Sequence, residues 1–144
     1  GRRAGTESVL LAVGLGAACE LVQQGVEIEV QRLRGLRDRL EELLTTGFAG
    51  AVVHGDRENR LPNTLSIGFP GADAASFLEA LADEVAASAG AACHAGTATV
   101  SHVLQAMGVA PALAAATVRL SVGRFTAAAE VERAAGLILN RLNV

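Results

Sequence analysis

The sequence predicts an α+β fold in which a small, largely antiparallel sheet is covered by helices. Segments with helical spacing of apolar residues occur alongside short segments in which apolar residues recur at every second position. Apolar residues make up 51% of the chain, yet only four residues are aromatic, all of them Phe, so Ala, Leu and Val must build the core. A length of 144 residues, without repeats or a clear linker, indicates a single domain over residues 1–144.

The first 45 residues carry two helical patterns. Apolar residues recur every fourth position from Val9 to Leu21 and predict a first helix, which Gly25 interrupts. A second, amphipathic helix is expected from Leu33 to Leu43. Its solvent-facing side is predicted to carry the charged residues, which are Arg32, Arg34, Arg37, Asp38, Arg39, Glu41 and Glu42.

Residues 46–144 are expected to form the sheet and its covering helices. Strands are predicted at 51–54, 64–69 and 117–122, with a possible fourth at 85–88. Asp73 can cap a helix over 74–83, Ser101 can cap one ending at Met107, and a short helix is expected after Pro111. Thr126 is predicted to cap the last helix on its own, although Glu130 comes one residue too late for a strict capping box.

Composition and charge argue against several classes of protein. The net charge of −3 and the absence of basic runs argue against a nucleic-acid partner. The apolar run 9–18 is too short to span a bilayer and follows no signal-peptide pattern, so we expect a cytoplasmic chain with no membrane partner. The two cysteines form no disulfide framework, and no metal site is predicted.

All twelve basic residues are Arg, and the chain contains no Lys. Any reaction that needs a lysine amine, such as formation of a Schiff base, cannot be completed by this chain alone. A codon bias that replaces Lys with Arg is a second explanation of the same fact.

Three residues are candidates for a functional site. Cys93 lies among small residues, which would leave a thiol accessible, although a lone Cys is more often structural, as we expect for Cys19 on an apolar helix face. Arg119 lies within a predicted strand and is either a surface residue or a two-donor clamp for a carboxylate. Thr6 precedes a helix, where it is either an N-cap or a phosphate ligand.

Five segments, in this order and spacing, resemble the motifs of the cysteine desulfurase and selenocysteine lyase family. These enzymes are dimeric, depend on pyridoxal phosphate and have the class V aminotransferase fold. The resemblance covers residues 1 to about 135 and suggests the small C-terminal domain of such an enzyme. The segments are Arg3-Ala4-Gly5-Thr6-Glu7, Arg60-Leu61-Pro62-Asn63-Thr64-Leu65, Ala87-Ser88-Ala89-Gly90-Ala91-Ala92-Cys93-His94, Ser101-His102-Val103-Leu104 with Met107-Gly108, and Val118-Arg119-Leu120-Ser121-Val122-Gly123-Arg124-Phe125-Thr126.

The resemblance implies a role for each candidate residue. Cys93 would take sulfur from L-cysteine as a persulfide and leave L-alanine. Arg119 would hold the substrate α-carboxylate. Thr6 would reach the cofactor phosphate of the neighbouring subunit, so that residues 1–45 form a dimer-crossing segment and 46–144 a small α+β domain. A homodimer and a sulfur-acceptor protein are the partners that this implies.

The chain also departs from the family pattern. The family's cofactor-binding lysine, its stacking histidine and an aspartate belong to a large domain that we expect before residue 1, so the chain alone is expected to be inactive. His94 could tune the Cys93 thiolate, and Val100 stands where the family often has Pro.

Three other functions stay open. A selenocysteine lyase is the nearest, because the Ala-Ala-Cys-His sequence at 91–94 resembles those enzymes. A stand-alone, non-catalytic sulfur carrier or assembly module is the second. A thiol redox protein is disfavoured because no second Cys lies near Cys93 in the sequence.

Overall fold

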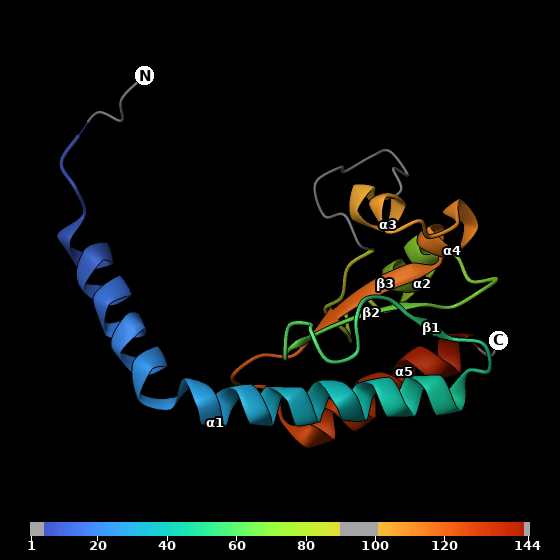
Figure 1. The fold of residues 1–144 in the computed structure, drawn as a ribbon, viewed down its shortest axis with the longest axis horizontal. Helices are drawn as coiled ribbons and strands as arrows, with labels where there is room; N and C mark the ends of the chain where they lie inside the picture. The colour runs from blue at the N-terminus through green and yellow to red at the C-terminus, as the bar shows by residue number, and fades with distance from the viewer. Residues whose placement is uncertain (1–4, 90–100, 143–144) are drawn as a thin grey trace.

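A computed structural model describes residues 5–89 and 101–142 (Figure 1). In these residues a long helix leads into a small sheet, and further helices follow. The elements in chain order are α1 (Val9–Gly47), β1 (Val52–Val53), β2 (Thr64–Gly68), α2 (Ala74–Ala80), α3 (His102–Ala106), α4 (Pro111–Ala115), β3 (Thr117–Ser121) and α5 (Ala128–Leu142).

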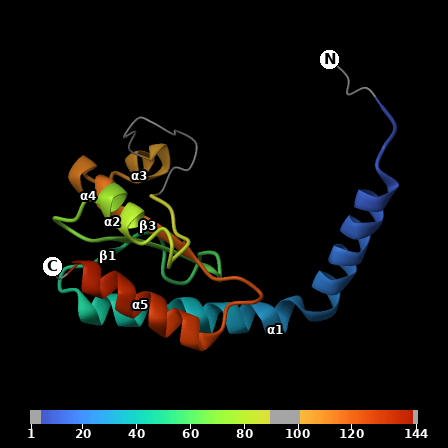
Figure 2. The same ribbon diagram turned by 180° about the vertical axis from the view of Figure 1, so that it is seen from behind.

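The sheet is antiparallel, in the order β1-β2-β3, as the sequence predicts. One face is apolar, because Leu65 and Ile67 of β2 lie opposite Leu120 and Val118 of β3, and all four are buried. Helix α5 and the C-terminal half of α1 lie side by side against this face, while α3 and α4 lie on the other side of the sheet (Figures 1 and 2). The fold is therefore the predicted α+β arrangement.

Helix α1 is a single helix of 39 residues, so the prediction that Gly25 interrupts it is wrong. A glycine inside a helix costs only about 1 kcal/mol relative to Ala, and the helix formers on both sides outweigh that cost. The helix bends part-way along its length (Figure 1). Its N-cap is Ser8, whose side chain accepts a hydrogen bond of 3.4 Å from the amide of Leu11.

Arg37 corrects the predicted charged face of this helix. Its side chain was expected in solvent but is only 3% exposed. The spacing explains this position, because Arg37 falls between Leu33 and Leu40 on the same face of the helix. Its Nη1 donates a 2.7 Å hydrogen bond to the carbonyl of Leu61, and Nε and Nη2 donate to Asp38 Oδ1. The guanidinium thus ties α1 to the loop before β2.

The prediction that no segment spans a membrane used the length of the apolar run 9–18 alone. In the structure this run is part of the longer helix α1. In the described residues, α1 is long and apolar enough to cross a membrane, with a mean hydropathy of 1.6 over an 18-residue window of which no part is buried. Length and composition alone do not distinguish a bilayer span from a helix that other protein covers. Large exposed apolar patches typically mark sites of contact with other protein or with a membrane.

The capping residues of the shorter helices follow the prediction in two of three cases. Asp73 accepts from the amide of Ala75, and Ser101 Oγ from that of Leu104 at 3.5 Å. The last helix begins at Ala128 rather than after Thr126, because the carboxylate of Glu130 accepts a 2.8 Å bond from the amide of Ala127. Glu130 therefore has the spacing of a capping box after all, counted from Ala127.

Helix α2 and the possible fourth strand are both shorter than predicted. Helix α2 ends at Ala80 instead of 83, and the chain turns at Leu81, whose side chain is 1% exposed in the core. In the segment 85–88, Ser88 alone pairs with β3, as an isolated bridge to Arg119.

Candidate functional site

Arg119 lies in the middle of β3, and its side chain is exposed on the sheet face opposite the core. Its neighbours Val118 and Leu120 point into the core, because side chains alternate along a strand. Ser66 of β2 is its direct cross-strand partner. Direct partners share one face of a sheet, so Arg119 stands on a polar row where a guanidinium can meet a ligand.

The other edge of β3 brings the segment before Cys93 to Arg119. Arg119 donates a 2.7 Å backbone hydrogen bond to the carbonyl of Ser88, and the amide of Ser88 donates one of 3.2 Å to the carbonyl of Arg119. The side-chain oxygen of Ser88 is buried and has no hydrogen-bond partner in the part of the chain that the structure describes. Cys93 follows Ser88 by five residues and lies outside the described residues, as do His94 and Val100.

Thr6 is exposed and comes just before the first turn of α1. The end of α1 that it precedes lies far from the sheet (Figures 1 and 2). The interpretation of Thr6 as an N-cap is wrong, because Ser8 caps the helix. Within one chain the structure therefore does not bring Thr6 and Arg119 together.

Cys19 is exposed, which corrects the expectation of a buried structural thiol. The apolar helix face on which it was expected to be covered has large exposed side chains near it, such as Leu15 and Leu21. The sequence showed the apolar pattern correctly but could not show that this chain leaves it uncovered.

A loop directly after β3 is held by Arg32 of α1, which is exposed, as predicted. Its guanidinium donates to the carbonyls of Thr126 at 2.9 Å, Gly123 at 3.1 Å and Arg124 at 2.8 Å. Two further bonds of 2.9 Å go to the carboxylate of Glu29. The bonded guanidinium lowers the pKa of Glu29, and the same pair raises the pKa of Arg32. We call this set of contacts the Arg32 clamp.

His54 and Thr117 fasten the opposite end of the β2–β3 pair. Thr117 Oγ1 donates to the carbonyl of Leu113 at 2.7 Å and lies 3.0 Å from His54 Nε2. Because the hydroxyl has one proton and gives it to Leu113, it accepts from His54, whose Nε2 must carry the hydrogen. Partial burial lowers the pKa of His54, so the neutral ring is favoured.

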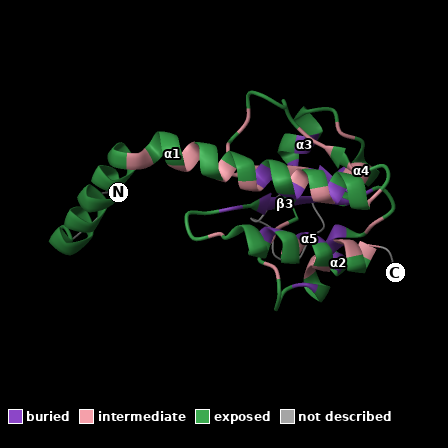
Figure 3. Cartoon of the chain, turned by 90° about the horizontal axis from the view of Figure 1, so that it is seen from below, coloured by how far each residue is buried: buried purple, intermediate pink, exposed green. Residues whose placement is uncertain are grey.

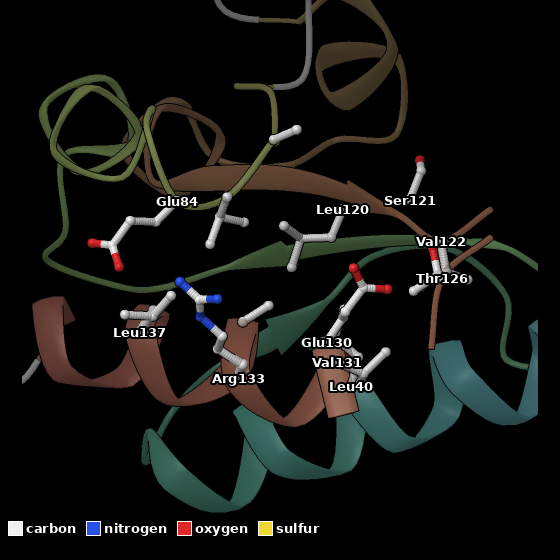
Figure 4. Close-up of a pocket in the computed structure, with 13 residues that line it drawn as sticks. Leu40, Glu84, Leu120, Ser121, Val122, Thr126, Glu130, Val131, Arg133 and Leu137 are labelled. Atoms are coloured by element: carbon white, nitrogen blue, oxygen red, sulfur yellow. The ribbon is translucent and has the colours of Figure 1, made fainter. Parts of the chain in front are cut away.

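A cavity of about 310 Å³ lies between α5 and the segment 84–86 (Figure 4). Apolar side chains such as Val131 and Leu137 line it, with Glu130 and Arg133 among its polar residues. Leu120, which also lines it, points to the core face of the sheet, whereas Arg119 points to the other face. The cavity is thus separate from the Arg119 row. Across the described ranges 5–89 and 101–142, no group of three His, Cys, Asp or Glu residues could hold a metal ion.

The comparison with protein families gives one match over most of the chain. Residues 1–134 match the model of the family described as aminotransferase class-V. This chain belongs to that family. Members of it are generally dependent on pyridoxal phosphate.

Curated relatives include a "Cysteine desulfurase" of Gluconacetobacter diazotrophicus, 43% identical over 134 residues, and a "Cysteine desulfurase NifS" of Azotobacter vinelandii, 41% identical over 134 residues. Each alignment covers 92% of this chain but only 34% and 33%, respectively, of the relative. The chain thus spans about a third of the length of these relatives.

Solved structures give the same result. A "NIFS-like protein" matches with a TM-score of 0.83 and 27% identity, over 98% of this chain and 35% of the other. A NifS-like protein from Rickettsia africae matches with a TM-score of 0.84 and 26% identity, over 99% and 37%. The expected resemblance to class V aminotransferases and cysteine desulfurases is confirmed, and so is the fold class.

The residues that the structure describes do not form a complete pyridoxal phosphate site. The chain has no Lys to bond the cofactor covalently. Thr6 offers one exposed hydroxyl, and Arg119 stands far from it at the sheet. A cofactor site would therefore need groups from outside this chain.

Proposed function

We propose that this chain is the part of a pyridoxal phosphate-dependent cysteine desulfurase that holds the substrate carboxylate and carries the persulfide. Membership of the family and the printed names of the relatives support this proposal. One structural observation carries it: Ser88, at the start of the segment that leads to Cys93, is bonded to Arg119 through both of its backbone groups. The segment that leads to the proposed nucleophile, Cys93, therefore begins directly beside the proposed carboxylate-binding residue, Arg119.

Each residue then has a chemical task. The guanidinium of Arg119 binds the α-carboxylate of L-cysteine with two parallel hydrogen bonds. The Cys93 thiolate forms a bond to the substrate sulfur as the bond between that sulfur and the substrate Cβ breaks. The Cβ takes up a proton, L-alanine leaves, and Cys93 keeps the sulfur as a persulfide for an acceptor protein. Bound pyridoxal phosphate supplies the electron sink for the amino acid.

Thr6 serves a second subunit in this proposal. Its distance from Arg119 along α1 suits a hydroxyl that reaches the cofactor phosphate of a neighbouring subunit in a homodimer. Residues 1–45 then cross the dimer and 46–144 form the small domain. The rest of the cofactor site comes from a large domain, the chain alone is inactive, and the enzyme works in the cytoplasm.

Selenocysteine lyase activity is the second candidate, because the sequence Ala91-Ala92-Cys93-His94 resembles those enzymes. In that case the same residues would handle selenium from L-selenocysteine, and L-cysteine would be a poor substrate. Comparing alanine release from the two amino acids distinguishes them. Sulfur or selenium transfer without any alanine release would instead indicate a carrier module.

The test uses a chimaeric enzyme, in which this chain replaces the matching 134 residues of the Gluconacetobacter diazotrophicus cysteine desulfurase. Arg119→Lys keeps the charge but loses the planar pair of donors, so kcat/KM for L-cysteine should fall about ten- to a hundred-fold. Arg124→Lys, a change at an exposed Arg in the loop after the same strand, is the matched control and should leave kcat/KM within about twofold. Equal activity of the two variants would remove Arg119 from the site.

A further inference from the structure

The geometry points to Arg32 as a positioning residue, which fixes β3, the strand of Arg119, to helix α1. The role in catalysis rests on the function proposed above, but the mechanical role does not. Arg32 lies within the family match, which covers residues 1–134, but in none of the five motif segments.

The Arg32 clamp depends on the planar geometry of the guanidinium. Three carbonyls of one short loop converge on a single guanidinium, at 3.1 Å for Gly123, 2.8 Å for Arg124 and 2.9 Å for Thr126. Glu29, one turn earlier on the same helix, holds the guanidinium from behind with two bonds of 2.9 Å. A planar group with donors on several sides can make this set of bonds, and a lysine ammonium cannot.

The loop itself is closed by its own hydrogen bonds. The amide of Gly123 donates to Thr126 Oγ1 at 2.9 Å, and the amide of Thr126 donates to the Gly123 carbonyl at 3.0 Å. Phe125, in the same turn, is 93% exposed. The clamp thus acts on a preformed turn and not on a loose chain.

This turn begins two residues after β3 ends, and four residues after Arg119. Between them, Val122 exchanges hydrogen bonds with Asn63: its amide donates to the Asn63 carbonyl at 3.0 Å, and its carbonyl accepts from Asn63 Nδ2 at 3.3 Å. Displacement of the turn therefore pulls directly on the strand through a short, bonded path. The clamp sets the position of Arg119 relative to α1, the helix that Thr6 precedes in the chain.

The first test uses this chain and amide hydrogen exchange. Arg32→Ala should speed exchange at the amides of Arg119 and Ser88, which close the bridge at the outer edge of β3, by about tenfold relative to the amide of buried Ile138 in α5. The ratio matters because a general loss of stability speeds exchange at all three amides alike.

Arg39→Ala is the matched control. Arg39 lies on the same helix and bridges to Glu132 of α5 at 2.7 Å and to Glu42 at 2.9 Å, but it bonds no carbonyl of the loop. Its removal should leave the exchange ratio unchanged, and Arg32→Lys should behave as Arg32→Ala does. An unchanged ratio in Arg32→Ala would overturn the inference.

The second test uses the chimaeric enzyme. Arg32→Ala should raise KM for L-cysteine at least about fivefold with a smaller change in kcat, because the carboxylate arginine is misplaced and not removed. Arg39→Ala should leave KM unchanged. A normal KM in Arg32→Ala, in an enzyme where Arg119→Lys is impaired, contradicts the role in catalysis. If Arg119→Lys is unimpaired, the proposed function fails, and the exchange ratio still tests the clamp.

Discussion

The two halves of helix α1 have opposite surroundings. In the C-terminal half, Leu40 and Leu44 are buried against the sheet and α5. In the N-terminal half, which we call the arm (residues 9–28), large apolar side chains are exposed, among them Leu11 at 73% and Ile28 at 80% (Figure 3). One helix thus changes from a core element to an uncovered one with no change in secondary structure.

The difference shows how a sequence pattern distinguishes a helix with one buried face from a helix that is apolar on all sides. A soluble amphipathic helix has a polar side, but apolar residues in the arm occupy consecutive positions from Val9 to Val13 and so point in all directions. A helix that is apolar all round is typically buried in protein or in a membrane. The relatives are about three times as long as this chain.

The largest difference between the halves is expected in stability. Leu44→Ala removes a side chain with 0% exposure and should lower the free energy of unfolding by about 2–5 kcal/mol. Leu11→Ala in the arm should change it by no more than about 0.5 kcal/mol. Urea unfolding of both variants measures the contrast, and a comparable loss in Leu11→Ala would mean that the arm is already covered in the isolated chain.

A smaller effect is expected where α1 holds the loop before β2. Arg37→Ala removes a buried donor and leaves the Leu61 carbonyl without its partner, so stability should fall by about 1–3 kcal/mol. Arg34→Ala, at an exposed position of the same helix, should change stability by less than about 0.5 kcal/mol. Thermal unfolding of the two variants, at equal pH, separates a buried arginine from a solvent-facing one; equal melting temperatures would contradict the assigned contact.

The smallest effect concerns pH. Burial lowers the pKa of His54 below its usual 6.5, so the unfolded chain binds a proton more readily than the folded one. The contribution of His54 is therefore full above pH 6.5 and is lost as the pH falls through its lowered folded-state pKa. In His54→Asn, the decline in stability between pH 7 and pH 5 should be shallower than in the parent chain. Parallel declines would show that His54 does not respond to this burial.

Sequence patterns predicted those elements in which the local spacing of apolar residues matches the face that is buried. Strands β2 and β3 were predicted within one residue, because their alternation reflects a sheet with one buried face. Arg37 was wrongly placed in solvent, and the bonds of the exposed Arg32 were missed, because the sequence shows a charge but not the distant carbonyls that bind it. Leu61 lies 24 residues from Arg37, and the loop carbonyls lie more than 90 residues from Arg32.

The candidate site was predictable only in part, for a related reason. The strand pattern placed Arg119 on the exposed face, as found. It could not show that Ser88 pairs with Arg119, since a single bridge leaves no periodic pattern. Cys19 was misjudged because an apolar pattern indicates that a surface is to be covered but not whether this chain covers it.

The most direct test is to locate the persulfide. The chimaeric enzyme, shown to bind pyridoxal phosphate by its visible absorption, is incubated with L-cysteine, and its peptides are analysed by mass spectrometry without reductant. We predict one additional sulfur atom on the peptide that contains Cys93, none on that of Cys19, and release of L-alanine that Cys93→Ser abolishes and Cys19→Ser does not. A cofactor-bound chimaera that releases alanine equally well with Cys93→Ser, or that carries the sulfur on Cys19, would contradict the account.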